Sequence, residues 1–127
     1  MSDERKTEER RPWPPATLLV GFDGSDGSGD AVALAAALGG AGATVVLVNV
    51  MPATGPLPTR PRLLDSHELP EASEFFAPAR AALEGFQVET RTYLGGSAAR
   101  VLTEIAEDGR TDVVVVGSTS RSAVGRA

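Results

Sequence analysis

The stretch TLLVGFDGSDGSGDAVALAAAL, residues Thr17–Leu38, joins an apolar run to an alanine-rich run through a turn dense in glycine, aspartate and serine. The apolar run, Ala16–Phe22, is short and meets Asp23, as a buried strand ending in a polar loop does. From Gly29 to Leu38 apolar residues recur at helical spacing, and the glycines that follow are typical of a helix end. The stretch therefore predicts a strand, a turn and a helix, and such a turn is a candidate ligand site.

Three further segments have the pattern of strands. Ala43–Val50 is rich in β-branched residues and too short for a helix. Thr111–Gly117 is apolar on both faces. Gln87–Leu94 alternates apolar and polar residues, which is typical of an edge strand with one wetter face. Met51–Pro70, with five prolines, is predicted to be a long loop.

Two more helices are predicted between these strands. Glu71–Glu84 is expected to be helical, with a kink or an early end at Pro78. Ser97 can cap a further helix whose apolar residues recur at helical spacing until Gly109. Alternating strands and helices predict an α/β fold, a doubly wound parallel sheet with helices on both faces. Because such sheets bind ligands beyond the carboxyl ends of their strands, the loops after the first and last strands are the functional candidates.

Composition excludes several classes of function. The 127 residues form one domain and contain no cysteine, which excludes thiolate metal sites and cysteine nucleophiles. The only histidine, His67, falls in the proline-rich loop and is read as solvated. A spread net charge of −5 argues against a nucleic-acid or anionic-membrane partner. Residues 1–15 are charged, offer only Trp13 for burial and are expected to be a disordered tail rather than a signal peptide, so we expect a cytoplasmic protein.

Phosphate-binding and catalytic motifs fail at the opening turn. A P-loop requires a lysine there, and the only lysine is Lys6. The dinucleotide fingerprint would need a third glycine where Val32 stands. A phosphatase of the Asp-x-Asp type would need an aspartate at Ser25. No nucleophile–base pair or metal cluster is evident, so we expect no enzyme, no catalytic residue and no protein-bound metal.

Three blocks of the chain, LLVGFDGSDGSGDAVALAAAL, GATVVLVNV and YLGGSAARVLTEIAEDGRTDVVVVGS, together resemble successive blocks of the universal stress protein family. The resemblance runs from Leu18 to Gly125 and is weakest across Met51–Phe86. It implies a sheet of order 3-2-1-4-5 within a domain spanning 16–127. Because the chain stops at Ala127, we expect order 3-2-1-4, without the family's last helix and strand. The last strand would then be an apolar edge. We expect a sequence cut short; the alternatives are a homodimer or another edge-strand partner that covers the edge, and a degenerate copy of the family domain.

One branch of that family binds ATP, and the resemblance implies a site for it, with Mg²⁺ accompanying the nucleotide. Adenine and ribose would lie against the end of the first strand, with backbone contacts to adenine from the end of the second. The loop after the last strand would pass close to the triphosphate and offer it backbone N–H groups. The implied nucleotide-binding residues are Gly21, Phe22, Asp23, Val50, Val116, Gly117, Ser118 and Ser120.

The chain departs from the ATP-binding pattern in two places. Ser120 stands where that branch has a glycine, and the branch's second Gly-Ser would lie beyond Ala127. We therefore expect a stress-response regulatory protein that binds ATP weakly, with at most slow incidental ATP hydrolysis. The alternative is a nucleotide-free member that acts through dimerisation or partner binding. Asp23 has two readings as well, a cap for the following turn or a ligand contact, while Gly24, Gly27 and Gly29 are expected to serve the turn.

Overall fold

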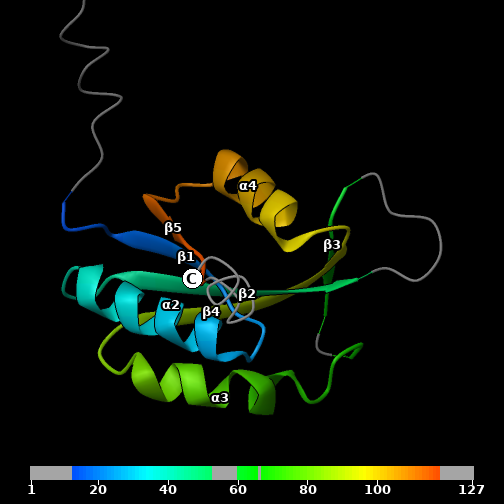
Figure 1. Cartoon of the computed structure of the whole chain (residues 1–127), viewed down its shortest axis with the longest axis horizontal. Coiled ribbons are helices and arrows are strands. Elements are labelled where there is room, and N and C mark those ends of the chain that lie inside the picture. Colours follow the sequence, from blue (N-terminus) through cyan, green and yellow to red (C-terminus); the bar gives the residue numbers. More distant parts are fainter. Residues whose placement is uncertain (1–12, 53–59, 66, 118–127) are drawn as a thin grey trace, which may run out of the picture.

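The computed structural model describes residues 13–52, 60–65 and 67–117 of the chain. Five strands and three helices alternate along these residues (Figure 1). In chain order they are β1 (Thr17–Gly21), α2 (Asp26–Leu38), β2 (Thr44–Pro52), β3 (Arg62–Leu64), α3 (Ala72–Ala82), β4 (Gln87–Gly95), α4 (Ala98–Asp108) and β5 (Val113–Val115).

The strands form one sheet of order β3-β4-β2-β1-β5. β4, β2, β1 and β5 pair in parallel, so the predicted order 3-2-1-4 is confirmed for the four predicted strands. β3 was not predicted: it pairs antiparallel with the end of β4, inside the segment expected to be a loop. The prediction of β4 as an edge strand is therefore wrong along Thr92–Leu94, where β3 covers it. Three residues among prolines give no strand pattern of their own, because pairing with β4 is what extends them.

Helices cover both faces of the sheet, as expected. α2 and α3 pack side by side on one face, and α4 crosses the other (Figure 1). Successive strand residues point to opposite faces, so each strand contributes to both layers. Leu18, Val20 and Leu47 face α2 and α3, whereas Leu19 and Val46 face α4.

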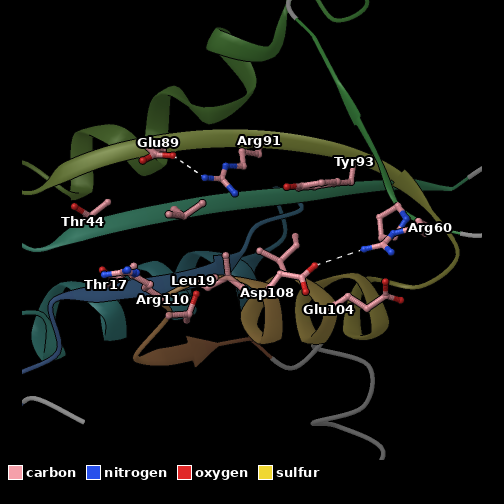
Figure 2. Close-up of a pocket in the computed structure, with 15 residues that line it drawn as sticks. Thr17, Leu19, Thr44, Arg60, Glu89, Arg91, Tyr93, Glu104, Asp108 and Arg110 are labelled. Carbon is pink, nitrogen blue, oxygen red and sulfur yellow. Dashed lines mark hydrogen bonds and ion pairs between the residues drawn. The ribbon is translucent and has the colours of Figure 1, made fainter. Parts of the chain in front are cut away.

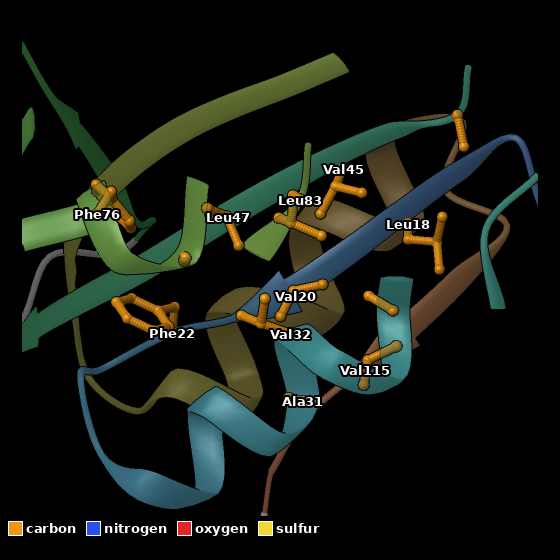
Figure 3. Close-up of a cluster of buried hydrophobic side chains, with 13 residues drawn as sticks. Leu18, Val20, Phe22, Ala31, Val32, Val45, Leu47, Phe76, Leu83 and Val115 are labelled. Atoms are coloured by element: carbon orange, nitrogen blue, oxygen red, sulfur yellow. The ribbon is translucent and has the colours of Figure 1, made fainter. Parts of the chain in front are cut away.

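The larger hydrophobic core lies between the sheet and the α2–α3 layer (Figure 3). Phe76 from α3 and Leu83 just after it are both 1% exposed and pack against the strand residues of this face. Phe22 extends the core past the end of β1, with its ring centroid 5.9 Å from that of Phe76. A smaller core on the opposite face is closed by Leu102 of α4. More of the hydrophobic core therefore lies under α2 and α3 than under α4.

Helix ends differ from the predictions at α2 and, by one or two residues, at α3, which spans Ala72–Ala82 instead of Glu71–Glu84. The helix α2 begins at Asp26, three residues before the predicted Gly29, because the Ser25 Oγ accepts a hydrogen bond from the Ser28 backbone N–H at 3.2 Å and caps it. Gly27 and Gly29 therefore lie inside the helix, and only Gly24, with φ of 83°, serves the turn as predicted. Ser97 caps α4 as expected. α3 continues through Pro78.

The two ends of the described chain lie beside the sheet. Of the predicted tail, residues 1–12 lie outside the described residues; Trp13 is exposed, while Pro15 is buried and its carbonyl accepts a hydrogen bond from the Gly40 N–H at 3.1 Å. β5 forms the outer strand beside β1, and Val114 is 40% exposed there. Among the described helices, none has the length and apolar character needed to cross a membrane.

Candidate functional site

A cavity of about 250 Å³ lies at the carboxyl ends of β1 and β2, the place where a doubly wound sheet carries its ligands. The first turns of α2 and α4 flank it, because Ser25 and Ser28 come from one helix start and Ala98 from the other. The positive ends of two helix dipoles therefore face the same space. The lining comprises Gly21, Phe22, Asp23, Ser25, Ser28, Val48, Asn49, Val50, Ala98, Leu102, Val116 and Gly117.

Gly21 sets the depth of the cavity at the end of β1. A Cβ at this position would lie 3.0 Å from Leu102 Cδ1 and 3.2 Å from Val116 Cγ1. Contacts this short leave no room for a side chain unless α4 or Val116 moves. The next residue, Phe22, turns its ring into the opposite core, where it is 6% exposed. It therefore offers the cavity its backbone and not its ring.

Asp23 is the carboxylate of the cavity. Its Oδ1 accepts a hydrogen bond from the Ser25 backbone N–H at 2.9 Å. Hydrogen bonding by Ser25, through its side chain first and then its backbone, lowers the pKa of Asp23 below its ordinary value, against a smaller opposing effect of burial. Asp23 is exposed and therefore carries a full negative charge at neutral pH. It stabilises the turn and, at the same time, presents a hydrogen-bond acceptor to the cavity.

Gly117 closes the other side of the cavity, where β5 leaves the sheet. A Cβ on Gly117 would collide with the carbonyl of Gly27 in α2. Only glycine fits here, because the collision is with backbone, which cannot rotate away as a side chain does. The chain after β5 thus passes directly against the first turn of α2.

The structure brings together six of the eight residues expected at the nucleotide site. Gly21, Asp23, Val50 and Gly117 line the cavity together with Phe22 and Val116. Ser118 and Ser120 lie outside the described residues. The sequence did not point to the α4 residues Ala98 and Leu102, although a capped helix start at the carboxyl edge of the sheet was a usable signal. Val48 was also missed, although alternation along β2 puts it on the same face as Val50.

A larger groove, of about 520 Å³, lies on the same face of the sheet toward the other end of its strands (Figure 2). Two ion pairs line it: Arg91 binds Glu89 at 3.0 Å, and Arg60 lies 3.7 Å from Asp108. Burial lowers the pKa of Arg91, but hydrogen bonds to Tyr93 and Glu89 outweigh it and raise that pKa above its ordinary value. Four charged side chains of the groove are thus paired with one another, whereas Arg110, which also lines it, forms no ion pair with a described residue. We assign this groove no ligand.

The chemistry available at the cavity is that of binding. It offers a carboxylate, small hydroxyls and backbone groups, and no group of three or more potential metal-ligating side chains occurs among the described residues. A carboxylate can accept hydrogen bonds from ribose hydroxyls, and helix starts attract anions.

Comparison with known proteins gives one family. The model of the universal stress protein family matches residues 16–127. A solved structure of the protein Rv1636 from Mycobacterium tuberculosis H37Rv is 28% identical, with a TM-score of 0.55, over 80% of this chain and 69% of that chain. A universal stress protein solved in complex with cAMP is 23% identical, with a TM-score of 0.53, over 79% of this chain and 74% of that one. A family member from Burkholderia pseudomallei is 24% identical, with a TM-score of 0.56, over 87% and 86%. Comparison with curated protein sequences finds no match.

Proposed function

The chain belongs to the universal stress protein family, and we propose that it is a stress-response regulatory protein whose cavity at the carboxyl ends of β1 and β2 binds an adenine nucleotide. The observation that carries the proposal is the convergence of Asp23, Gly21, Val50 and two helix starts on one small cavity. The role is binding and regulation, without a catalytic step.

The parts of the cavity suit the parts of a nucleotide. Asp23 would accept hydrogen bonds from the ribose hydroxyls, and the backbone at Val50 would contact the adenine edge. The two helix starts would attract the phosphate groups, although the acidic first-turn residue Asp26 weakens that attraction at α2. A relative of the same fold was solved with cAMP, so this fold accommodates an adenine nucleotide.

Three features make the expected affinity for ATP low. The cavity, at about 250 Å³, is smaller than the roughly 300 Å³ at which typical ligand sites begin, so part of an ATP molecule would extend beyond it. Ser120 replaces a glycine of the ATP-binding pattern. The acidic Asp26 lies in the first turn of α2, where its charge disfavours phosphate. We propose that Mg²⁺ accompanies the triphosphate and is held mainly by it.

Calorimetric titration of the whole chain with Mg-ATP tests the role of Asp23. Asp23→Asn removes the charge and keeps the shape, and we expect it to weaken ATP binding roughly tenfold, the difference between a hydrogen bond to a charged acceptor and one to a neutral acceptor. Asp26→Asn is the matched control, because Asp26 neighbours the cavity without lining it, and removal of its charge should leave ATP binding as tight or tighter. Equal affinities for Asp23→Asn and the unchanged chain would remove Asp23 from the site.

An alternative function, partner binding, is favoured by one observation. The β5 edge presents apolar surface, with Val114 40% and Val116 59% exposed. An outer strand of this kind is a template for pairing with another chain, which includes a second copy of this one. Light scattering across a concentration series, with Val114→Lys as the variant, checks this function. A dimer that the variant dissociates would support it, and a monomer at all concentrations would exclude self-association.

A further inference from the structure

A second cavity, of about 740 Å³, shares only Asn49 with the proposed nucleotide cavity. It lies on the opposite face of the sheet, which α2 and α3 cover in Figure 1. Its walls are apolar: Met51 comes from β2, Leu69 from the segment before α3, and Phe75 from α3 itself. Met51 and Phe75 are each 37% exposed, so their apolar surface is open to a ligand. The volume falls within the range of small-molecule sites.

Two polar side chains form the floor of this cavity. Asn49 on β2 and Thr92 on β4 are direct partners in the sheet register, and both face α3. Thr92 is 5% exposed, yet its hydroxyl makes no hydrogen bond to another described residue. Every fully buried side-chain nitrogen and oxygen in the described part of the chain has a partner. The Thr92 hydroxyl therefore keeps a small exposed area on the cavities it lines, this one and a smaller adjoining hollow that shares Leu69.

The rim of the cavity carries negative charge. Glu71 and Glu74, at the start of α3, line the cavity and are exposed. Neither forms an ion pair within the described ranges, whereas Glu68, the third glutamate of the rim, is bound by Arg62 at 3.0 Å. Glu71 also precedes α3 without capping it through its side chain. Two carboxylates are thus free to meet a ligand.

We propose that this cavity binds a small organic cation with an apolar body and a hydrogen-bonding group. Its ammonium group would lie at Glu71 and Glu74, and its apolar body against Met51 and Phe75. The far polar group would reach Thr92, whose nearly buried hydroxyl gains the most from a partner, since a buried polar group without one is costly. The same charges disfavour an anion, so the site differs in chemistry from the nucleotide cavity and does not depend on it.

Tyramine is a suitable probe, because it carries an ammonium group, an aromatic ring and a phenol hydroxyl. Amide chemical shifts of the whole chain, followed during titration, locate the site and give the affinity. We expect saturable shifts centred on Phe75 and Thr92, which line this cavity and not the nucleotide cavity. Neutral tyrosol should bind roughly threefold more weakly than tyramine, and 4-hydroxyphenylacetate more weakly still. Phenethylamine, which lacks the phenol hydroxyl, should bind roughly threefold more weakly than tyramine.

Two variants, each with a matched control, measure separately the contributions of the Thr92 hydroxyl and of the two glutamates to tyramine binding. Thr92→Val should remove the advantage of tyramine over phenethylamine, while Thr90→Val, on the same strand and face but outside this cavity, should keep it. Glu71→Gln with Glu74→Gln should abolish the preference for tyramine over tyrosol, and Glu84→Gln should not. Two results would overturn the proposal. The first is the absence of saturable shifts up to about 10 mM tyramine, a concentration that allows for the weak affinity of so small a ligand. The second is a set of shifts centred on Gly21 and Gly117. The proposal is overturned equally by anion binding as tight as cation binding, or by equal effects of the two threonine variants.

Discussion

Ser25 has two roles in the turn after β1. Its hydroxyl caps α2 by accepting the Ser28 N–H, and its side chain and backbone lower the pKa of Asp23. The same residue therefore starts the helix and lowers the pKa of the carboxylate in the proposed nucleotide cavity. Ser25 thus contributes both to the stability of α2 and to the proposed binding site, whereas the sequence identified it only as part of a polar turn.

Ser25→Ala should lower the free energy of unfolding by about 1 kcal/mol, the usual cost of losing a helix cap. It should also raise the pKa of Asp23 toward its ordinary value, because the largest cause of the shift is removed. A lowered carboxylate pKa adds stability above the unfolded-state pKa, and this stability is lost as pH falls through the folded-state pKa. The variant should therefore lose more stability at neutral pH than in acid.

Ser97→Ala is the matched control, because Ser97 caps α4 in the same way. It should cost a similar free energy of unfolding and leave the pKa of Asp23 unchanged. Denaturant unfolding at two pH values and carboxyl NMR titration measure both quantities. An unchanged Asp23 pKa in Ser25→Ala would contradict the role given to Ser25.

At the scale of the element, α2 contains a glycine that its structure does not require. Gly29 lies within the helix, its φ is not positive, and a Cβ there would have no atom within 4 Å. Gly29→Ala should therefore raise the free energy of unfolding by roughly 0.5–1 kcal/mol, since alanine loses less entropy in a helix. Gly24→Ala should instead lower it, because Gly24 has a φ of 83°. Thermal unfolding of both variants tests this, and a destabilised Gly29→Ala would show that the helix start needs its flexibility.

Elements with a strong pattern of their own could be predicted from the sequence. The four parallel strands and the Ser97-capped helix follow from periodicity and from capping residues. The antiparallel β3 could not be predicted, because its three residues are extended only by pairing with β4. The observed β5, Val113–Val115, is shorter than the predicted Thr111–Gly117, because only these residues pair with β1.

The residues of the candidate site that lie at strand ends could be predicted from the sequence. Gly21, Asp23 and Val50 follow directly from the carboxyl-edge rule and the family resemblance, and they do meet in one cavity. The pairing of Asn49 with Thr92 on the other face could not be predicted, because it depends on the register of two strands far apart in the chain. Strand register depends on the packing of the whole sheet, so it cannot be predicted from the residue pattern of one segment.

At the scale of the whole molecule, Phe76 ties α3 to the main core. It is 1% exposed and packs against Phe22 and Phe75, with ring centroids 5.9 and 5.1 Å away. Phe76→Ala should lower the free energy of unfolding by about 3–5 kcal/mol through the cavity it leaves. Phe75→Ala should cost less, since Phe75 is 37% exposed. Denaturant unfolding of both variants measures these losses. Equal losses in the free energy of unfolding would contradict the packing described for α3.

The central claim, that the cavity at the ends of β1 and β2 binds an adenine nucleotide, is tested most directly by titrating the whole chain with Mg-ATP and following backbone amide shifts. We predict saturable shifts at Gly21, Asp23, Val50 and Gly117, with a Kd weaker than micromolar. A micromolar Kd would contradict the low affinity inferred from Ser120 and the small cavity. The absence of saturable shifts, or shifts confined to other parts of the chain, would contradict nucleotide binding at this site and favour partner binding.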